Sequence, residues 1–145
     1  MHRIRLVGAA AGVSLAMLLG FIGSALGHAL LVSSDPAAGA SLATAPSEVT
    51  LTFTEQPDPA LSTIKVLATD GTSVGADPVS AVPGQPKELR VALGKLQPGV
   101  YTVSWRTVSS VDGHLASGSF AFGVGVSAPS AAPSQGGGSG VGGSS

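Results

Sequence analysis

Apolar and polar residues alternate in several short runs between residues 28 and 126. In 49–54, valine, leucine and phenylalanine alternate with threonines, and in 101–106, tyrosine, valine and tryptophan alternate with threonine, serine and arginine. A period of two places all the apolar side chains of a strand on one face. Further alternating runs lie at 64–68, 89–93 and 120–126. The pattern predicts short strands that each bury one face.

Turn-forming residues separate these runs and define the fold class. Segments rich in proline, glycine or aspartate lie at 35–39, 56–59 and 98–99, and the dipeptide Asp70-Gly71 suits a hairpin. Short strands at this spacing predict an all-β fold, an antiparallel Greek-key β-sandwich of about seven strands, like immunoglobulin or cupredoxin domains. Tyr101 resembles the tyrosine corner of such sandwiches.

The first 27 residues predict an export signal. Two arginines supply the positive start, an uncharged and mostly apolar stretch covers 6–26, and 25–27 supply the small residues that signal peptidases recognise. Cleavage after Gly27 would make His28 the N-terminal residue of a periplasmic or extracellular protein. The alternative is an uncleaved membrane anchor, because the apolar stretch is long enough to span a bilayer.

The C-terminal segment 127–145 reads SAPSAAPSQGGGSGVGGSS, without charged or aromatic residues. Such a composition has little to bury and predicts a flexible linker or disordered terminus. The chain therefore divides into a signal peptide at 1–27, a β-sandwich at 28–126 and a disordered Gly/Ser-rich tail at 127–145.

Composition excludes several classes of function. The chain has no cysteine, which rules out disulfides, zinc-thiolate sites and thiol nucleophiles. All eight acidic residues and five of the seven basic residues lie from residue 28 onward, so this part carries a net charge of -3. Without a basic patch, we expect no nucleic acid partner.

Two histidines, His28 and His114, remain after the predicted cleavage. An N-terminal histidine carries a free α-amine and an imidazole, which can chelate one metal ion together. The pKa of such an amine is only about 7.7–8.0, so it gives up its proton to a metal readily near neutral pH. Asp112 precedes His114 by two residues, which puts both side chains on one side of an extended segment. Gly113 between them allows a tight turn.

If the strands run alternately up and down, these residues meet at one end of the sandwich. The first strand begins at His28, the second ends at Glu55, and the loop with Asp112 and His114 joins the last two. Glu55 continues the series of every second residue formed by the apolar residues before it. We therefore expect its side chain to point inward, as theirs do. The sequence thus predicts a site with one amine, two imidazoles and one or two carboxylates.

This donor set favours Cu(II). Nitrogen-rich ligation with oxygen in tetragonal geometry suits Cu(II), whereas the main competitor, Zn(II), prefers a tetrahedral site. Cu(I) prefers sulfur ligands, and the only methionines, Met1 and Met17, precede the predicted cleavage site. The expected metal is therefore Cu(II).

Four segments in order along the chain resemble the CopC family of periplasmic copper-resistance proteins. They are HALLVSSDPAAG at 28–39, LTFTE at 51–55, LQPGVYTVSWR at 96–106 and SVDGH at 110–114. The resemblance implies that His28, Asp112 and His114 bind Cu(II), with Glu55 at or near the ion. It also implies an inner-membrane copper permease of the CopD type as a candidate partner. We expect the protein itself to be a monomer.

Three functions are open at this point. The first, which we expect, is a Cu(II) carrier or buffer in copper homeostasis and resistance, without enzymatic activity. The second is a copper-dependent oxidative enzyme, because lytic polysaccharide monooxygenases also chelate copper through an N-terminal histidine. A chain with 4% aromatic residues and an aspartate near the open copper position argues against it. The third is a metal-free sandwich module for adhesion or assembly.

Overall fold

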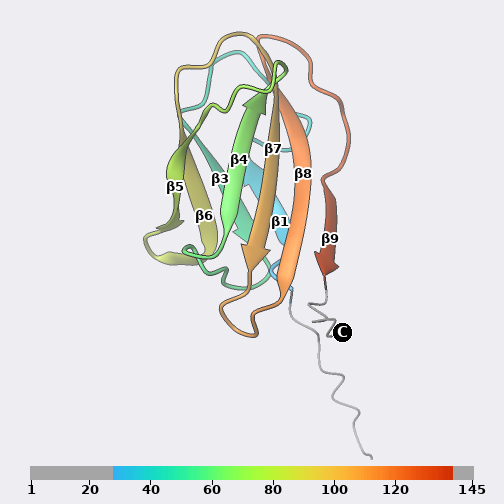
Figure 1. The fold of residues 1–145 in the computed structure, drawn as a ribbon. Helices are drawn as coiled ribbons and strands as arrows, with labels where there is room; N and C mark the ends of the chain where they lie inside the picture. The colour runs from blue at the N-terminus through green and yellow to red at the C-terminus, as the bar shows by residue number, and fades with distance from the viewer. Residues whose placement is uncertain (1–27, 139–145) are drawn as a thin grey trace, which may run out of the picture.

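A computed structural model describes residues 28–138, which form two β-sheets facing each other (Figure 1). The predicted signal peptide at 1–27 lies outside the described residues. Within 28–138, no helix is long and apolar enough to cross a membrane. The strands are β1 (Leu31–Asp35), β2 (Ser41–Leu42), β3 (Glu48–Phe53), β4 (Thr63–Ala68), β5 (Gly75–Val82), β6 (Gln85–Leu93), β7 (Gly99–Val108), β8 (Leu115–Val124) and β9 (Ser134–Gly138).

The long hairpin of β7 and β8 connects the two ends of the sandwich (Figure 1). One sheet has the order β1-β3-β6-β5, and the other has the order β2-β8-β7-β4. β7 and β8 pair antiparallel from Gly99↔Val124 to Val108↔Leu115. β2 and β9 share the far edge of β8, where β2 pairs with 123–124 and β9 with 115–119.

The alternating apolar residues fill the space between the sheets, as the sequence predicts. Leu51 is 0% exposed and Phe53 is 1% exposed in one sheet, and they face Val103 at 0% and Trp105 at 3% in the other. Complete burial of one such side chain contributes about 1.5–3 kcal/mol to folding. The predicted all-β sandwich is confirmed.

The sandwich contains two strands that the sequence does not predict, β2 and β9. β2 has two residues, too few to show a period. β9 lies in the tail expected to be flexible or disordered, and the structure differs from this expectation in describing Ser134–Gly138 as a strand. Its sequence, SQGGG, has no β-branched or aromatic residue, so its conformation depends on pairing with the edge of β8. Val126, expected on the inner face, is 40% exposed because β8 ends at Val124.

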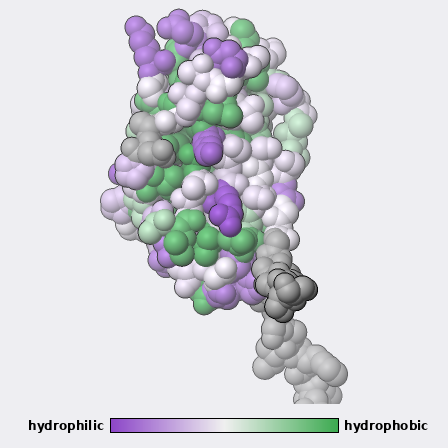
Figure 2. Space-filling model, in the orientation of Figure 1, coloured by the Kyte–Doolittle hydropathy of each residue, from purple (hydrophilic) through white to green (hydrophobic). Residues whose placement is uncertain are grey.

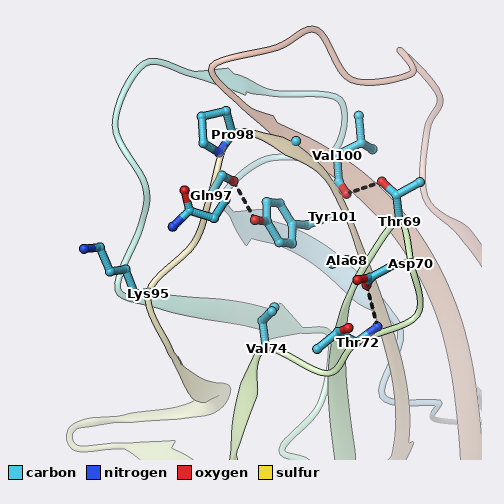
Figure 3. A pocket seen from close by; sticks show the side chains of 11 residues that line it. Ala68, Thr69, Asp70, Thr72, Val74, Lys95, Gln97, Pro98, Val100 and Tyr101 are labelled. Carbon is cyan, nitrogen blue, oxygen red and sulfur yellow. Dashed lines mark hydrogen bonds between the residues drawn. The ribbon is translucent and has the colours of Figure 1, made fainter.

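The tyrosine corner lies at the Gly99 end of β7. Tyr101 Oη donates a hydrogen bond to the carbonyl oxygen of Gln97 at 2.6 Å, as the resemblance to Greek-key sandwiches predicts (Figure 3). Figure 3 shows this bond in a pocket that Val74 and Lys95 also line. The loop that joins β7 to β8 lies at the opposite end of the hairpin.

The turn at Asp70-Gly71 forms, but it does not join neighbours of one sheet. Ala68 N–H donates to Thr72 O at 2.9 Å, and Val74 N–H donates to Val66 O at 2.9 Å. After this turn the chain passes from one sheet to the other, because β4 and β5 belong to different sheets.

On the face seen in Figure 2, hydrophilic residues are scattered among pale and hydrophobic ones.

Candidate metal centre

The loop between β7 and β8 carries Asp112 and His114 and is closed by its own backbone. Ser109 N–H donates to His114 O at 2.9 Å, and Gly113 N–H donates to Ser109 O at 2.8 Å. Gly113 has a φ of +74°, in the left-handed region that most residues avoid. The tight turn predicted at Gly113 is therefore present.

Asp112 contacts His114 through both carboxylate oxygens. Oδ1 accepts the backbone N–H of His114 at 3.1 Å, and Oδ2 lies 2.8 Å from His114 Nδ1. The hydrogen bond from the His114 backbone, followed by the contact with its side chain, lowers the pKa of Asp112. The carboxylate is therefore ionised at neutral pH and available as an oxygen donor.

The ring nitrogen of His114 that faces Asp112 is itself a candidate metal donor. Nδ1 is buried, and within residues 28–138 no aligned hydrogen bond reaches it. Asp112 Oδ2 thus approaches Nδ1 to 2.8 Å without the alignment of a hydrogen bond. Two donors at right angles on one ion, with bonds of about 2.0–2.1 Å, lie about 2.9 Å apart. The spacing fits two ligands of one metal.

His28 lies beside this pair. The ring centres of His28 and His114 are 5.2 Å apart, and the two planes are inclined by 45°. Two imidazoles that share an ion through bonds of about 2.0–2.1 Å have ring centres roughly 4.5–6 Å apart. The separation of the rings is therefore compatible with a shared ion, and the topological prediction that His28 lies near this loop agrees with the structure.

Two threonines hold the segment that contains His28, and sequence reasoning missed both. Thr54 Oγ1 donates to His28 O at 2.6 Å, and Thr54 N–H donates to Leu30 O at 2.8 Å. Thr107 is 0% exposed, and its Oγ1 donates to Ala29 O at 3.1 Å. Because Thr54 follows β3 and Thr107 belongs to β7, the segment is attached to both sheets. The signal in the sequence that could have found Thr107 is its place at an inward position of β7, where the other inward residues are apolar or aromatic.

Glu55 reaches the loop through Ser109. Ser109 Oγ donates to Glu55 Oε2 at 2.9 Å, and Ser109 is only 2% exposed. The chain after Glu55 is tied to the same loop, since Ser110 N–H donates to Gln56 O at 2.9 Å and Asp58 N–H donates to Val108 O at 2.8 Å. Within the described chain, the side-chain hydrogen bond of Glu55 is to Ser109, so Glu55 supports the start of the loop.

The four predicted site residues thus gather at one end of the molecule but do not form a complete metal site. Across residues 28–138, no group of three or more His, Asp and Glu side chains is placed to hold a metal ion. Asp112 and His114 form a pair, the His28 ring lies next to it, and Glu55 is connected through Ser109. In the uncleaved chain the nitrogen of His28 belongs to a peptide bond. Cleavage after Gly27 would turn it into an amine donor.

Comparison with known sequences identifies similar proteins. A sequence profile of the CopC domain matches residues 31–125. Protein YobA from Escherichia coli strain K12 is 37% identical over 98 residues, which cover 67% of this chain and 78% of YobA. Copper transport protein CutJ from Bacillus subtilis strain 168 is 33% identical over 99 residues, which cover 68% of this chain and 18% of CutJ.

Two solved structures share the fold of this chain. The crystal structure of CopC from Methylosinus trichosporium OB3b matches with a TM-score of 0.62 and 34% identity, covering 67% of this chain and 93% of that one. PcoC, a methionine-rich copper resistance protein from Escherichia coli, matches with a TM-score of 0.60 and 33% identity, covering 68% of this chain and 99% of that one.

Proposed function

Because the chain belongs to the CopC family, we propose that it binds Cu(II) outside the cytoplasm and acts as a carrier or buffer in copper homeostasis and resistance. The observation that carries the proposal is the convergence of three side chains from distant parts of the chain. The His28 ring lies 5.2 Å from the His114 ring, and His114 Nδ1 lies 2.8 Å from Asp112 Oδ2.

In this proposal His28 binds the ion through two of its atoms. Signal cleavage after Gly27 releases its α-amine, which joins the ring Nδ1 in a chelate. The amine, with a pKa of about 7.7–8.0, deprotonates readily when a metal competes for it. Thr54 and Thr107 hold the backbone that follows this chelate, through the His28 and Ala29 carbonyls.

Asp112 and His114 supply the remaining donors. The ionised carboxylate of Asp112 offsets part of the charge of the ion, and His114 contributes Nδ1. Glu55 acts on the site indirectly, because it orients Ser109 at the start of the loop that carries Asp112 and His114. Such outer partners fix the direction of metal ligands and commonly alter metal affinity.

The choice of Cu(II) follows from the donor chemistry. Amine, imidazole and carboxylate donors suit Cu(II), and residues 28–145 contain neither methionine nor cysteine, the soft donors that Cu(I) prefers. The similar PcoC is a methionine-rich copper resistance protein. The proposed role here is therefore limited to Cu(II).

The proposed location is the periplasm or the outside of the cell, reached through the signal peptide at 1–27. The proposed partner is an inner-membrane copper permease of the CopD type, which would exchange the ion with a monomeric carrier. The protein acts in this scheme by binding and release of the ion, without catalysis.

The test compares two forms of the protein that differ by one residue at the N-terminus. The mature chain begins at His28, and the control carries one extra glycine before it, with both termini verified by mass spectrometry. We expect the extra residue to remove most of the Cu(II) affinity in a competition titration, because the amine no longer lies on the residue that carries the imidazole. Equal affinity of the two forms would contradict the chelate. If neither form shows a Cu(II)-dependent rise in melting temperature, the copper function itself is wrong.

A further inference from the structure

Strand β9 (Ser134–Gly138) lies next to the candidate metal centre, although the part of the chain that matches the CopC domain ends at residue 125. β9 pairs antiparallel with β8, from Ser119↔Ser134 to Leu115↔Gly138 (Figure 1). It therefore runs toward the loop that carries Asp112 and His114. Its glycines give it little intrinsic preference for a strand, so specific contacts must hold it there.

The side chain of Gln135 attaches β9 to the opposite sheet. Gln135 Oε1 accepts the backbone N–H of Leu31 at 2.8 Å, and Gln135 Nε2 donates to Leu31 O at 3.3 Å. Leu31 is the first residue of β1 and lies three positions after His28. β9 thus bridges the two sheets at the edge where the N-terminal segment enters the fold.

Gly137 brings the backbone of β9 against the His28 ring. A Cβ atom at Gly137 would lie 2.4 Å from His28 Cδ2 and 2.8 Å from Nε2, closer than atoms of these types can approach. The contact is therefore made possible by the missing side chain. The ring atoms nearest to that position are Cδ2, Nε2 and Cγ, so β9 packs against the imidazole at Cδ2.

We propose that β9 positions His28 for metal binding by packing against its ring at Cδ2. This inference rests on the proposed Cu(II) function, in which His28 binds through its amine and Nδ1. With β9 in place, the ring is held in the orientation that it has beside His114. Gln135 and Gly137 are positioning residues, because they act on the metal through His28. The tail beyond the matched domain is then part of the metal centre.

The chain offers a matched pair of variants for the test. Gly137→Ala places a methyl group against the ring, whereas Gly136→Ala adds the same methyl group where no atom lies within 4 Å. Both glycines are in β9 and neither has a positive φ, so the two substitutions differ mainly in the contact with His28. Gln135→Ala removes the two hydrogen bonds to Leu31 and provides an independent way to release the strand.

The first readout needs no copper. In the metal-free mature chain, we expect a nuclear Overhauser effect between the Gly137 α-protons and His28 Hδ2. We expect Gly136→Ala to retain the packing of β9 on the ring, and Gly137→Ala and Gln135→Ala to shift the ring resonances of His28. If the wild-type chain lacks this effect, or if Gly137→Ala and Gly136→Ala leave the same His28 spectrum, the proposal is overturned.

The second readout is the rate at which Cu(II) passes to the chelator EDTA in stopped-flow experiments. We expect Gly137→Ala and Gln135→Ala to release the ion at least about fivefold faster than wild type, the lower end of typical coupling between linked sites. Gly136→Ala should match wild type. Equal release rates in all four proteins would overturn the role of β9 while leaving Cu(II) binding intact. A wild-type chain that binds no Cu(II) would instead overturn the proposed function.

Discussion

At the scale of single residues, the candidate centre depends on side chains that bind no metal in the proposed scheme. Thr107 donates its hydroxyl proton to Ala29 O at 3.1 Å, and Thr54 donates to His28 O at 2.6 Å. Ser109 performs a similar task for Glu55 at 2.9 Å. Sequence motifs can identify His28, Asp112 and His114 as candidates, because their residue types carry the chemistry. The hydroxyl partners have no such signature, since a threonine in a strand is common.

Thr107→Val tests whether the buried hydroxyl positions His28. The substitution keeps the shape of the side chain but leaves the Ala29 carbonyl without this donor, so we expect the free energy of unfolding to fall by about 1–3 kcal/mol. We also expect Cu(II) affinity to fall about tenfold or more, which is typical when an outer partner of a metal ligand is removed. Chemical denaturation and competition titration measure the two effects.

Tyr101→Phe is the matched control for this variant. It also removes one hydroxyl from β7, but at the opposite end of the strand, where Tyr101 Oη donates to Gln97 O at 2.6 Å. We expect a loss of about 0.5–1.5 kcal/mol in unfolding free energy and no change in Cu(II) affinity. If Thr107→Val retained the same Cu(II) affinity as Tyr101→Phe, Thr107 would have no role in positioning His28.

At the scale of elements, the sequence predicts the strands that bury one face and misses those that do not. In β3 and β7 every second side chain is buried in the core. The alternation in the sequence therefore predicts both the strand and the face of the strand that points inward. β9 buries no apolar side chain and forms only because β8 has a free edge and Gln135 reaches Leu31. Such a strand depends on the assembled fold, which a local pattern does not contain.

The loop between β7 and β8 allows a test of backbone geometry. Gly113 has a φ of +74°, and a Cβ atom there would meet nothing within 4 Å. Gly113→Ala therefore introduces backbone strain without a collision, at a cost of about 1–3 kcal/mol. We expect the melting temperature of the mature domain to fall by about 4 °C or more in thermal unfolding. Gly113→Asn should lose less, because asparagine tolerates the left-handed region. An equal loss in both variants would contradict this account of the loop.

At the scale of the whole molecule, the antiparallel hairpin of β7 and β8 has a structural feature at one end and the candidate metal centre at the other. The tyrosine corner closes one end, and the candidate metal centre occupies the other, where the N-terminal segment, the loop and β9 meet. The CopC family and the all-β sandwich, both predicted from motifs spread along the chain, are confirmed. The ligand roles of His28, Asp112, His114 and Glu55 stay predictions, because within residues 28–138 no group of three or more His, Asp and Glu side chains is placed to hold a metal ion.

In the proposed function, Cu(II) binds to the free N-terminal His28 together with His114 and Asp112. An electron paramagnetic resonance spectrum of the Cu(II) form of the mature chain, recorded beside that of the chain with one extra N-terminal glycine, tests this binding. We predict a tetragonal spectrum with nitrogen couplings from the His28 amine, the His28 ring and the His114 ring, and the loss of this spectrum in the extended chain. Identical spectra from the two chains, or a spectrum without coupling to the amine nitrogen, would contradict the account.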